Sequence, residues 1–119
     1  MGRDTLRTEP KLKKDGNRTF KPTETSSRKG DLAEYYAVTW LWDNGYEVFR
    51  NAGCTGPIDL IAYKDGITTL VDVKTTRTDL RGGIKTVKSK RTQEQIEKGV
   101  VFLAFEPDTR KLRWVDHTE

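Results

Sequence analysis

Two strand-like segments, residues 58–63 and 68–74, flank the dipeptide Asp65-Gly66 and constrain the fold more than any other feature. Asp-Gly between alternating apolar residues is a typical signal for a tight hairpin turn. Antiparallel strands joined by such a turn lie about 5 Å apart. Asp59, at the start of the first strand, is therefore expected to face Asp72, at the end of the second. The pattern predicts a β-hairpin whose open end carries two carboxylates.

The second strand ends in Asp72-Val73-Lys74, an unusual place for charge. Side chains at positions i and i+2 of a strand share a face, so Asp72 and Lys74 point one way and Val71 and Val73 the other. Strand interiors disfavour charged residues, which favours a functional explanation. The structural alternative is a simple salt bridge between Asp72 and Lys74 in a domain without catalytic activity.

Length and composition limit the class of protein. A chain of 119 residues is about one domain, and its longest apolar runs, such as residues 100–105, are too short to cross a bilayer. The first residues lack the apolar segment of a secretory signal, and the single cysteine, Cys54, excludes an internal disulfide. These features predict a soluble, cytoplasmic protein without a membrane partner.

Charge is distributed unevenly along the chain. Residues 1–29 hold nine Lys/Arg against four Asp/Glu, and residues 74–91 hold seven against one, whereas the whole chain carries only +4. The remainder is therefore acidic. This distribution predicts a polyanion partner held beside a cation-binding pocket, although basic loops can also be merely solvated. The expected nucleic-acid-binding residues in the second segment are Arg77, Arg81, Lys85, Lys88, Lys90 and Arg91.

Turn and cap signals divide the chain into an arm and a domain. Residues 1–27 are polar and basic and are expected to form a flexible arm, followed by a folded domain over 28–119. A helix is expected over 28–44, because residues 26–29 offer N-cap side chains and Gly45 a stop. The segment from 75 to 91 reads as a flexible, phosphate-seeking loop. The other expected elements are strands 46–50, 58–63 and 68–74, a helix over 91–98, and strands 100–105 and 111–115.

Glu34 lies on the apolar stripe of the first expected helix, with Ala37, Val38 and Leu41. A carboxylate on a core-facing stripe is costly unless it is paired or binds a metal, which favours a functional role. The alternative is a Glu at the edge of the stripe that reaches water or a nearby lysine. Four aromatic side chains of the same helix are expected to be packing groups: Tyr35, Tyr36, Trp40 and Trp42.

Several common chemistries are excluded by residue type. The only histidine, His117, lies near the end of the sequence and reads as a terminal polar residue, and no Gly-x-Ser-x-Gly stretch is present. One Cys and one His cannot form a four-ligand zinc site, and Cys54 reads as a small loop residue. What remains is carboxylates and a lysine, which suit Mg²⁺-assisted chemistry on a phosphate. Lys74 could orient or deprotonate a water, and the carbonyl of Val73 could be a further oxygen ligand.

Glu34, Pro57-Ile58-Asp59 and Asp72-Val73-Lys74 together resemble the motif of the PD-(D/E)XK nuclease superfamily. The stretch from Lys29 to Glu34 resembles the opening helix of its Holliday junction resolvases and group I intron homing endonucleases. In this sequence Ile58 interrupts the usual Pro-Asp dipeptide. The interruption resembles a variation that those resolvase-like branches also show. The resemblance implies an α/β (α+β) fold with a restriction-endonuclease-like αβββαβ core, in which helices flank a mixed sheet.

The resemblance also implies roles for the site residues. Glu34, Asp59, Asp72 and the Val73 carbonyl would bind Mg²⁺ or Mn²⁺, and Lys74 would position the hydrolytic water. Gln93 resembles a glutamine that several branches place near the active site, and Gln95 is an equally reachable candidate.

The expected activity is a metal-dependent DNA endonuclease, most similar to junction resolvases or homing endonucleases. Cutting both strands would require a homodimer, because one active site addresses one scissile phosphate. The alternatives are a single-strand-specific nuclease or nickase, and a catalytically silent DNA-binding module of the same fold.

Overall fold

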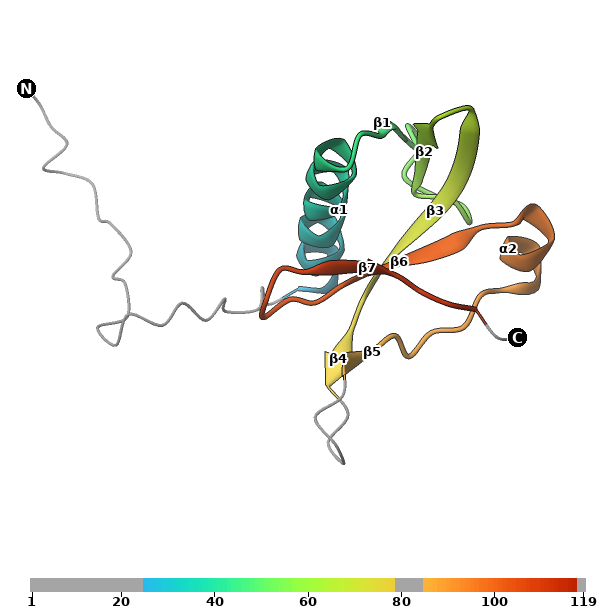
Figure 1. The fold of residues 1–119 in the computed structure, drawn as a ribbon. Coiled ribbons are helices and arrows are strands. Elements are labelled where there is room, and N and C mark those ends of the chain that lie inside the picture. The colour runs from blue at the N-terminus through green and yellow to red at the C-terminus, as the bar shows by residue number, and fades with distance from the viewer. Residues whose placement is uncertain (1–24, 79–84, 118–119) are drawn as a thin grey trace, which may run out of the picture.

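The computed structural model describes residues 25–78 and 85–117. Five strands form a mixed sheet in the order β1-β2-β3-β6-β7, and β4 and β5 pair separately as a small two-stranded sheet. Figure 1 shows α1 beside the main sheet, α2 on the right, and β4 and β5 at the bottom, apart from the other strands. The elements are α1 (Ser26–Asp43), β1 (Glu47–Arg50), β2 (Leu60–Lys64), β3 (Ile67–Thr75), β4 (Arg77–Thr78), β5 (Lys85–Thr86), α2 (Gln93–Lys98), β6 (Val101–Phe105) and β7 (Leu112–Trp114).

Helix α1 begins two residues earlier than the sequence predicts. Its N-cap is Thr25, whose hydroxyl accepts a hydrogen bond from the backbone N–H of Arg28, so the expected cap within residues 26–29 is wrong. The helix ends at Asp43, and Gly45 follows with a φ of 86° that favours glycine. The predicted stop is therefore confirmed. Most of the predicted arm, residues 1–24, lies outside the described residues.

The central hairpin of β2 and β3 confirms the turn prediction. Asp65 and Gly66 have φ angles of 53° and 81°, the positive values that a tight hairpin turn of this twist needs. The register pairs Leu60 with Val71 and Lys64 with Ile67. Because β2 begins only at Leu60, Asp59 lies just beyond the paired strand, at the open end of the hairpin.

The second half of the chain adds a parallel strand through α2. Strand β6 runs parallel to β3, with Asp72 opposite Phe102, so α2 lies in a crossover connection. The helix has a capping box made by Thr92 and Gln95, and Gly99 ends it in the left-handed conformation. The predicted helix and the strand that follows it are therefore confirmed, although the helix begins at Gln93 and not at residue 91.

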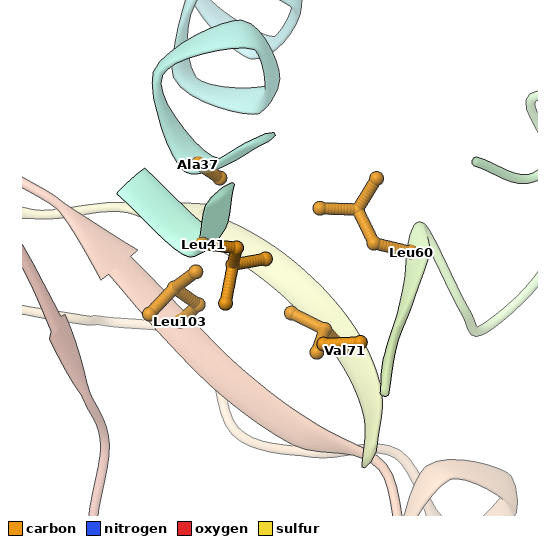
Figure 2. Close-up of a cluster of buried hydrophobic side chains, with 6 residues drawn as sticks. Ala37, Leu41, Leu60, Val71 and Leu103 are labelled. Carbon is orange, nitrogen blue, oxygen red and sulfur yellow. The ribbon is translucent and has the colours of Figure 1, made fainter. Parts of the chain in front are cut away.

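The hydrophobic core lies between α1 and one face of the main sheet. Figure 2 shows Ala37 and Leu41 of α1 gathered with the side chains of Leu60, Val71 and Leu103. Since side chains alternate along a strand, Asp72, Lys74 and Phe102 point to the opposite face. Helix α1 therefore covers the apolar face and leaves the charged face to the site.

Three expectations from the sequence are corrected by the fold. Tyr35 and Trp42 are exposed, at 62% and 61%, so only two of the four helical aromatics pack. Tyr36 stacks on Phe105, and Trp40 contacts Trp114 edge to face. The segment 75–91, expected as a loop throughout, contains the paired strands β4 and β5.

His117 is the third correction, because it is a structural residue. Its Nε2 accepts a hydrogen bond from the backbone N–H of Phe102 at 3.0 Å, and the two rings meet edge to face. Just before it, the backbone N–H of Val115 donates to the carbonyl of Phe102. The segment after β7 thus continues along β6. Among the described helices, none is both long and apolar enough to span a membrane.

Candidate active site

Asp59 is positioned by backbone contacts at the open end of the hairpin. Its backbone N–H donates to the carbonyl of Val71 at 2.8 Å, and its Oδ2 accepts from the backbone N–H of Val73 at 2.8 Å. The Asp59 carboxylate thus accepts a hydrogen bond that a backbone carbonyl would accept if the β2–β3 pairing continued by one more step. This contact directs the Asp59 side chain toward the backbone between Asp72 and Lys74.

Asn51 shapes the loop that leads to Asp59. Its amide donates to the carbonyls of Thr55 and Ile58, at 2.7 and 2.8 Å, while its Oδ1 accepts from the N–H of Gly53 at 2.9 Å. An Asn that hydrogen-bonds the backbone two residues on is a recognised turn former. Asn51 is a positioning residue that the sequence prediction missed, and the Asn-x-Gly spacing was the available signal.

Asp72 is the buried carboxylate of the site, with 6% of its surface exposed. Its Oδ2 lies 3.0 Å from Lys74 Nζ and accepts a hydrogen bond from Gln95 Nε2 at 3.2 Å. The Lys74 ammonium also lies 5.3 Å from the ring centroid of Phe102. A buried charge needs such partners, and Asp72 has a cation and an amide.

Burial and the neighbouring Asp72 shift the ionisation of Asp59. The pKa of Asp59 is raised to about 7, chiefly by burial and then by its hydrogen bond to Asp72 and the charges of Asp72 and Glu34. The hydrogen bond from the Val73 N–H opposes this shift. Two carboxylates that share a site disfavour a second negative charge, so Asp59 holds a proton readily near neutral pH. The pair is therefore a place where a cation would be stabilised.

Family comparison agrees with this geometry. Residues 24–112 match the family model of the PD-(D/E)XK endonucleases, which is more than half of the chain. The chain belongs to this family. The matched segment includes α1, the Asp59–Asp72 hairpin and Gln95, so the predicted family and its fold are confirmed.

Two relatives are similar to this chain over part of their length. A UPF0102 protein of Treponema pallidum is 38% identical over 78 residues, which cover 63% of this chain and 62% of the relative. A UPF0102 protein of Caulobacter vibrioides is 35% identical over 83 residues, which cover 67% and 65%. The match thus spans somewhat less than two thirds of each relative's own length.

A solved structure has a similar fold. A bacterial homing endonuclease superposes with a TM-score of 0.65 at 22% identity, covering 78% of this chain and 66% of that one. At this identity the likeness concerns the fold alone. The restriction-endonuclease-like architecture, a mixed sheet flanked by helices, is confirmed.

Gln95, and not Gln93, is the glutamine that lies beside the carboxylates. Gln95 is buried, and its amide nitrogen donates to Asp72 and to the carbonyl of Pro57 at 3.0 Å. Gln93 is exposed, and its amide donates to Glu97 at 3.2 Å. The first-named choice is therefore corrected, because Gln95 lies on the inward face of α2 and Gln93 does not.

Glu34 faces a partner that the sequence did not suggest. Its Oε1 accepts from Nε of Arg50 and lies 3.1 Å from Nη2 of the same guanidinium, which also stacks over Tyr35. Glu34 still acts electrostatically on Asp59. Within residues 25–78 and 85–117, however, no three His, Cys, Asp or Glu side chains are grouped closely enough to hold one ion. Of the three carboxylates predicted to bind metal, the structure brings Asp59 and Asp72 together, whereas Glu34 pairs with Arg50.

The predicted DNA-binding residues differ in their surroundings. Arg77 and Lys88 line a cleft beside Lys74, and Lys90 is exposed. Arg91 is engaged by the protein, since its Nη1 donates to the carbonyl of Val100 at 3.1 Å. Arg81 and the side chain of Lys85 lie outside the described part of the chain.

Proposed function

We propose that this PD-(D/E)XK endonuclease hydrolyses phosphodiester bonds of DNA with Mg²⁺ or Mn²⁺ bound by Asp59 and Asp72. The carrying observation is the convergence of these two carboxylates beside Lys74, with the pKa of Asp59 raised to about 7. A carboxylate pair of this kind is poorly explained as a structural salt bridge, because the Lys74–Asp72 ion pair accounts for only one of the two acids.

The donor set fits a hard divalent cation. Mg²⁺ is commonly held by one or two carboxylates and completes its octahedron with waters and substrate phosphate, so a third protein carboxylate is not required. A cation bound there would supply Lewis acidity toward the phosphate oxygens and toward an attacking water. Val73 and Glu34 are proposed as secondary ligands, through a backbone carbonyl and through water or a side-chain movement away from Arg50.

The protein's own residues have separate tasks in this proposal. Lys74 holds a positive charge at the reacting phosphate and orients the attacking water. Gln95 fixes the orientation of Asp72 through its amide, and Val73 fixes that of Asp59 through its N–H. Gln95 is thus a positioning residue.

The proposed substrate is a branched or duplex DNA that presents phosphates on more than one strand. The homing endonuclease neighbour and the basic residues after Lys74 support this choice. A homodimer would supply two active sites for two scissile phosphates.

Cleavage assays test the proposal directly. We expect the wild type with Mg²⁺ to cut a four-way junction or supercoiled plasmid, and EDTA or Asp72→Asn to abolish cutting. Glu47→Gln, an exposed acid on β1, is the matched control and should retain activity. Equal cutting by wild type and Asp72→Asn, or no cutting of junction, duplex and single-stranded DNA by wild type, would refute the proposal. Cutting of single strands alone would instead identify a single-strand-specific nuclease.

A further inference from the structure

A cleft of about 660 Å³ opens beside Lys74. It lies between the first turn of α1, the end of β3 and the segment before α2; we call it the basic cleft. Its lining contains five cationic side chains and, among the described residues, no acidic one. The cationic residues are Lys29, Lys74, Arg77, Lys88 and Arg110. Such a lining concentrates anions.

The N-terminus of α1 adds to the positive potential of the basic cleft. Ser26, Lys29 and Gly30 contribute to its wall, and the first turn of this 18-residue helix carries no acidic side chain. Thr25 caps only part of the turn, through its contacts with Arg28 and Lys29. Backbone N–H groups at a helix start bind phosphates when nothing else satisfies them.

Thr76 gives independent evidence for a ligand in the basic cleft. This lining residue is only 5% exposed, and among the described residues its hydroxyl has no hydrogen-bond partner. Its backbone N–H is held by the carbonyl of Phe105 at 2.9 Å, so the residue is fixed in place. A buried hydroxyl without a partner costs stability. A bound oxyanion would recover that stability by accepting a hydrogen bond from the hydroxyl.

Gly30 shows a second departure from what stability alone favours. It occupies an interior position of α1, where glycine costs about 1 kcal/mol relative to alanine. A Cβ at Gly30 would meet no atom within 4 Å, so packing does not require the glycine. Because Gly30 has no side chain, nothing projects from this position into the basic cleft, and the helix backbone there is accessible.

We propose that the basic cleft binds a second phosphate of the nucleic-acid strand, next to the phosphate held at Asp59, Asp72 and Lys74. Lys74 belongs to both places, because its ammonium lies 3.0 Å from Asp72 while the residue lines the cleft. The inference rests on the proposed function for the identity of the ligand. The cleft would then fix the register of the strand, with Thr76, Lys88 and the start of α1 as its phosphate ligands.

Binding of a fluorescent oligonucleotide in EDTA tests the basic cleft without cleavage. We expect Lys88→Gln and Thr76→Val each to weaken binding about tenfold, since each removes a contact to a charged phosphate. Lys64→Gln, which removes the same charge at the far end of the β2–β3 hairpin, should weaken it about twofold or less. Affinities of Lys88→Gln and Thr76→Val equal to that of Lys64→Gln would overturn the proposal.

Thermal stability distinguishes a ligand site from a merely structural role. Without ligand, Thr76→Val and Gly30→Ala should melt at the same temperature as wild type or higher, although both bind the oligonucleotide more weakly. A lowered melting temperature for both variants with unchanged binding would overturn the proposal.

Inorganic phosphate identifies the source of the anion. Titrated against chloride at equal ionic strength, phosphate should shift the amide resonances of Thr76 and Gly30 saturably, and the oligonucleotide should displace it. Saturable phosphate binding that the oligonucleotide does not displace would assign the cleft to a free anion and refute a nucleic-acid subsite. Because all of these measurements omit the divalent metal, absence of cleavage would leave their outcome unaffected.

Discussion

Lys74 connects the carboxylate pair with the basic cleft, and its position depends on Asp72. The Lys74 side chain is one-third exposed, and its ammonium lies 3.0 Å from a carboxylate that is itself nearly buried. Gln95 approaches the same oxygen at 3.2 Å. Asp72 therefore has two donors that orient it, and the loss of either should be measurable.

Gln95→Ala should lower the cleavage rate about 10–100-fold, because residues that orient a ligand usually contribute that much. The substitution also removes part of the α2 capping box, so a stability control is needed. Thr92→Ala removes the same cap without touching Asp72, and it should cost about 1 kcal/mol of unfolding free energy while activity at a permissive temperature is retained. Gln93→Ala should behave as wild type. Equal rates for the Gln93 and Gln95 variants would contradict the assignment.

Asp59 should make the stability of the metal-free protein depend on pH. Its pKa is about 7 in the folded chain against an ordinary value of 3.8, so between these values the folded state binds more protons than the unfolded state. The free energy of unfolding consequently falls as pH rises through this window. Thermal melts in EDTA from about pH 4 to about pH 8 should show this decline in the wild type and a shallower one in Asp59→Asn. Parallel curves for the two proteins would show that Asp59 titrates normally.

The β2–β3 hairpin sets the distance between the two aspartates, and its turn depends on one glycine. Gly66 has a φ of 81°, which costs an L-residue about 1–2 kcal/mol. Gly66→Ala should lower the unfolding free energy by about that amount in chemical denaturation. Cleavage per folded molecule should remain, because the turn lies at the opposite end of the hairpin from Asp59. Gly53→Ala, at a glycine without a positive φ, is the control and should cost clearly less.

Helix α1 serves the core and the site with different residues. Ala37 and Leu41 pack on the sheet, Glu34 contacts Arg50, and Gly30 lines the basic cleft. One helix thus carries an apolar face and, near its start, functional positions. This division explains why a carboxylate occurs beside its apolar stripe.

At the level of the whole molecule, divalent metal should stabilise the fold. A ligand that binds only the folded state adds about 2.7 kcal/mol at a concentration 100 times its dissociation constant. Mg²⁺ or Mn²⁺ should therefore raise the melting temperature of the wild type, more at pH 8 than at pH 6, because protons compete for Asp59. Asp72→Asn should show no such rise, whereas Glu47→Gln should behave as wild type. An equal rise in all three proteins would indicate metal binding elsewhere.

Much of this protein was predictable from local sequence. Strand alternation, the Asp65-Gly66 turn and the glycine stops after both helices are consequences of backbone geometry within a few residues. They were sufficient to place Asp59 opposite Asp72. The family was indicated instead by the resemblance of Glu34, Pro57-Ile58-Asp59 and Asp72-Val73-Lys74 to a known motif. Errors at this level were small, such as the N-cap at Thr25, because neighbouring hydroxyl residues offer competing caps.

Contacts between distant parts of the chain were decided only by the tertiary structure. Arg50 reaches Glu34 across 16 residues of sequence, and Gln95 reaches Asp72 across 23. Gln93 and Gln95 have the same chemistry, and only the rotation of α2 against the sheet selects between them. The sequence likewise does not show that the Thr76 hydroxyl lacks a partner among the described residues, because burial and hydrogen bonding depend on which elements close around a residue. Local periodicity thus determined the strands and their two aspartates, whereas three-dimensional packing determined which side chains complete the site.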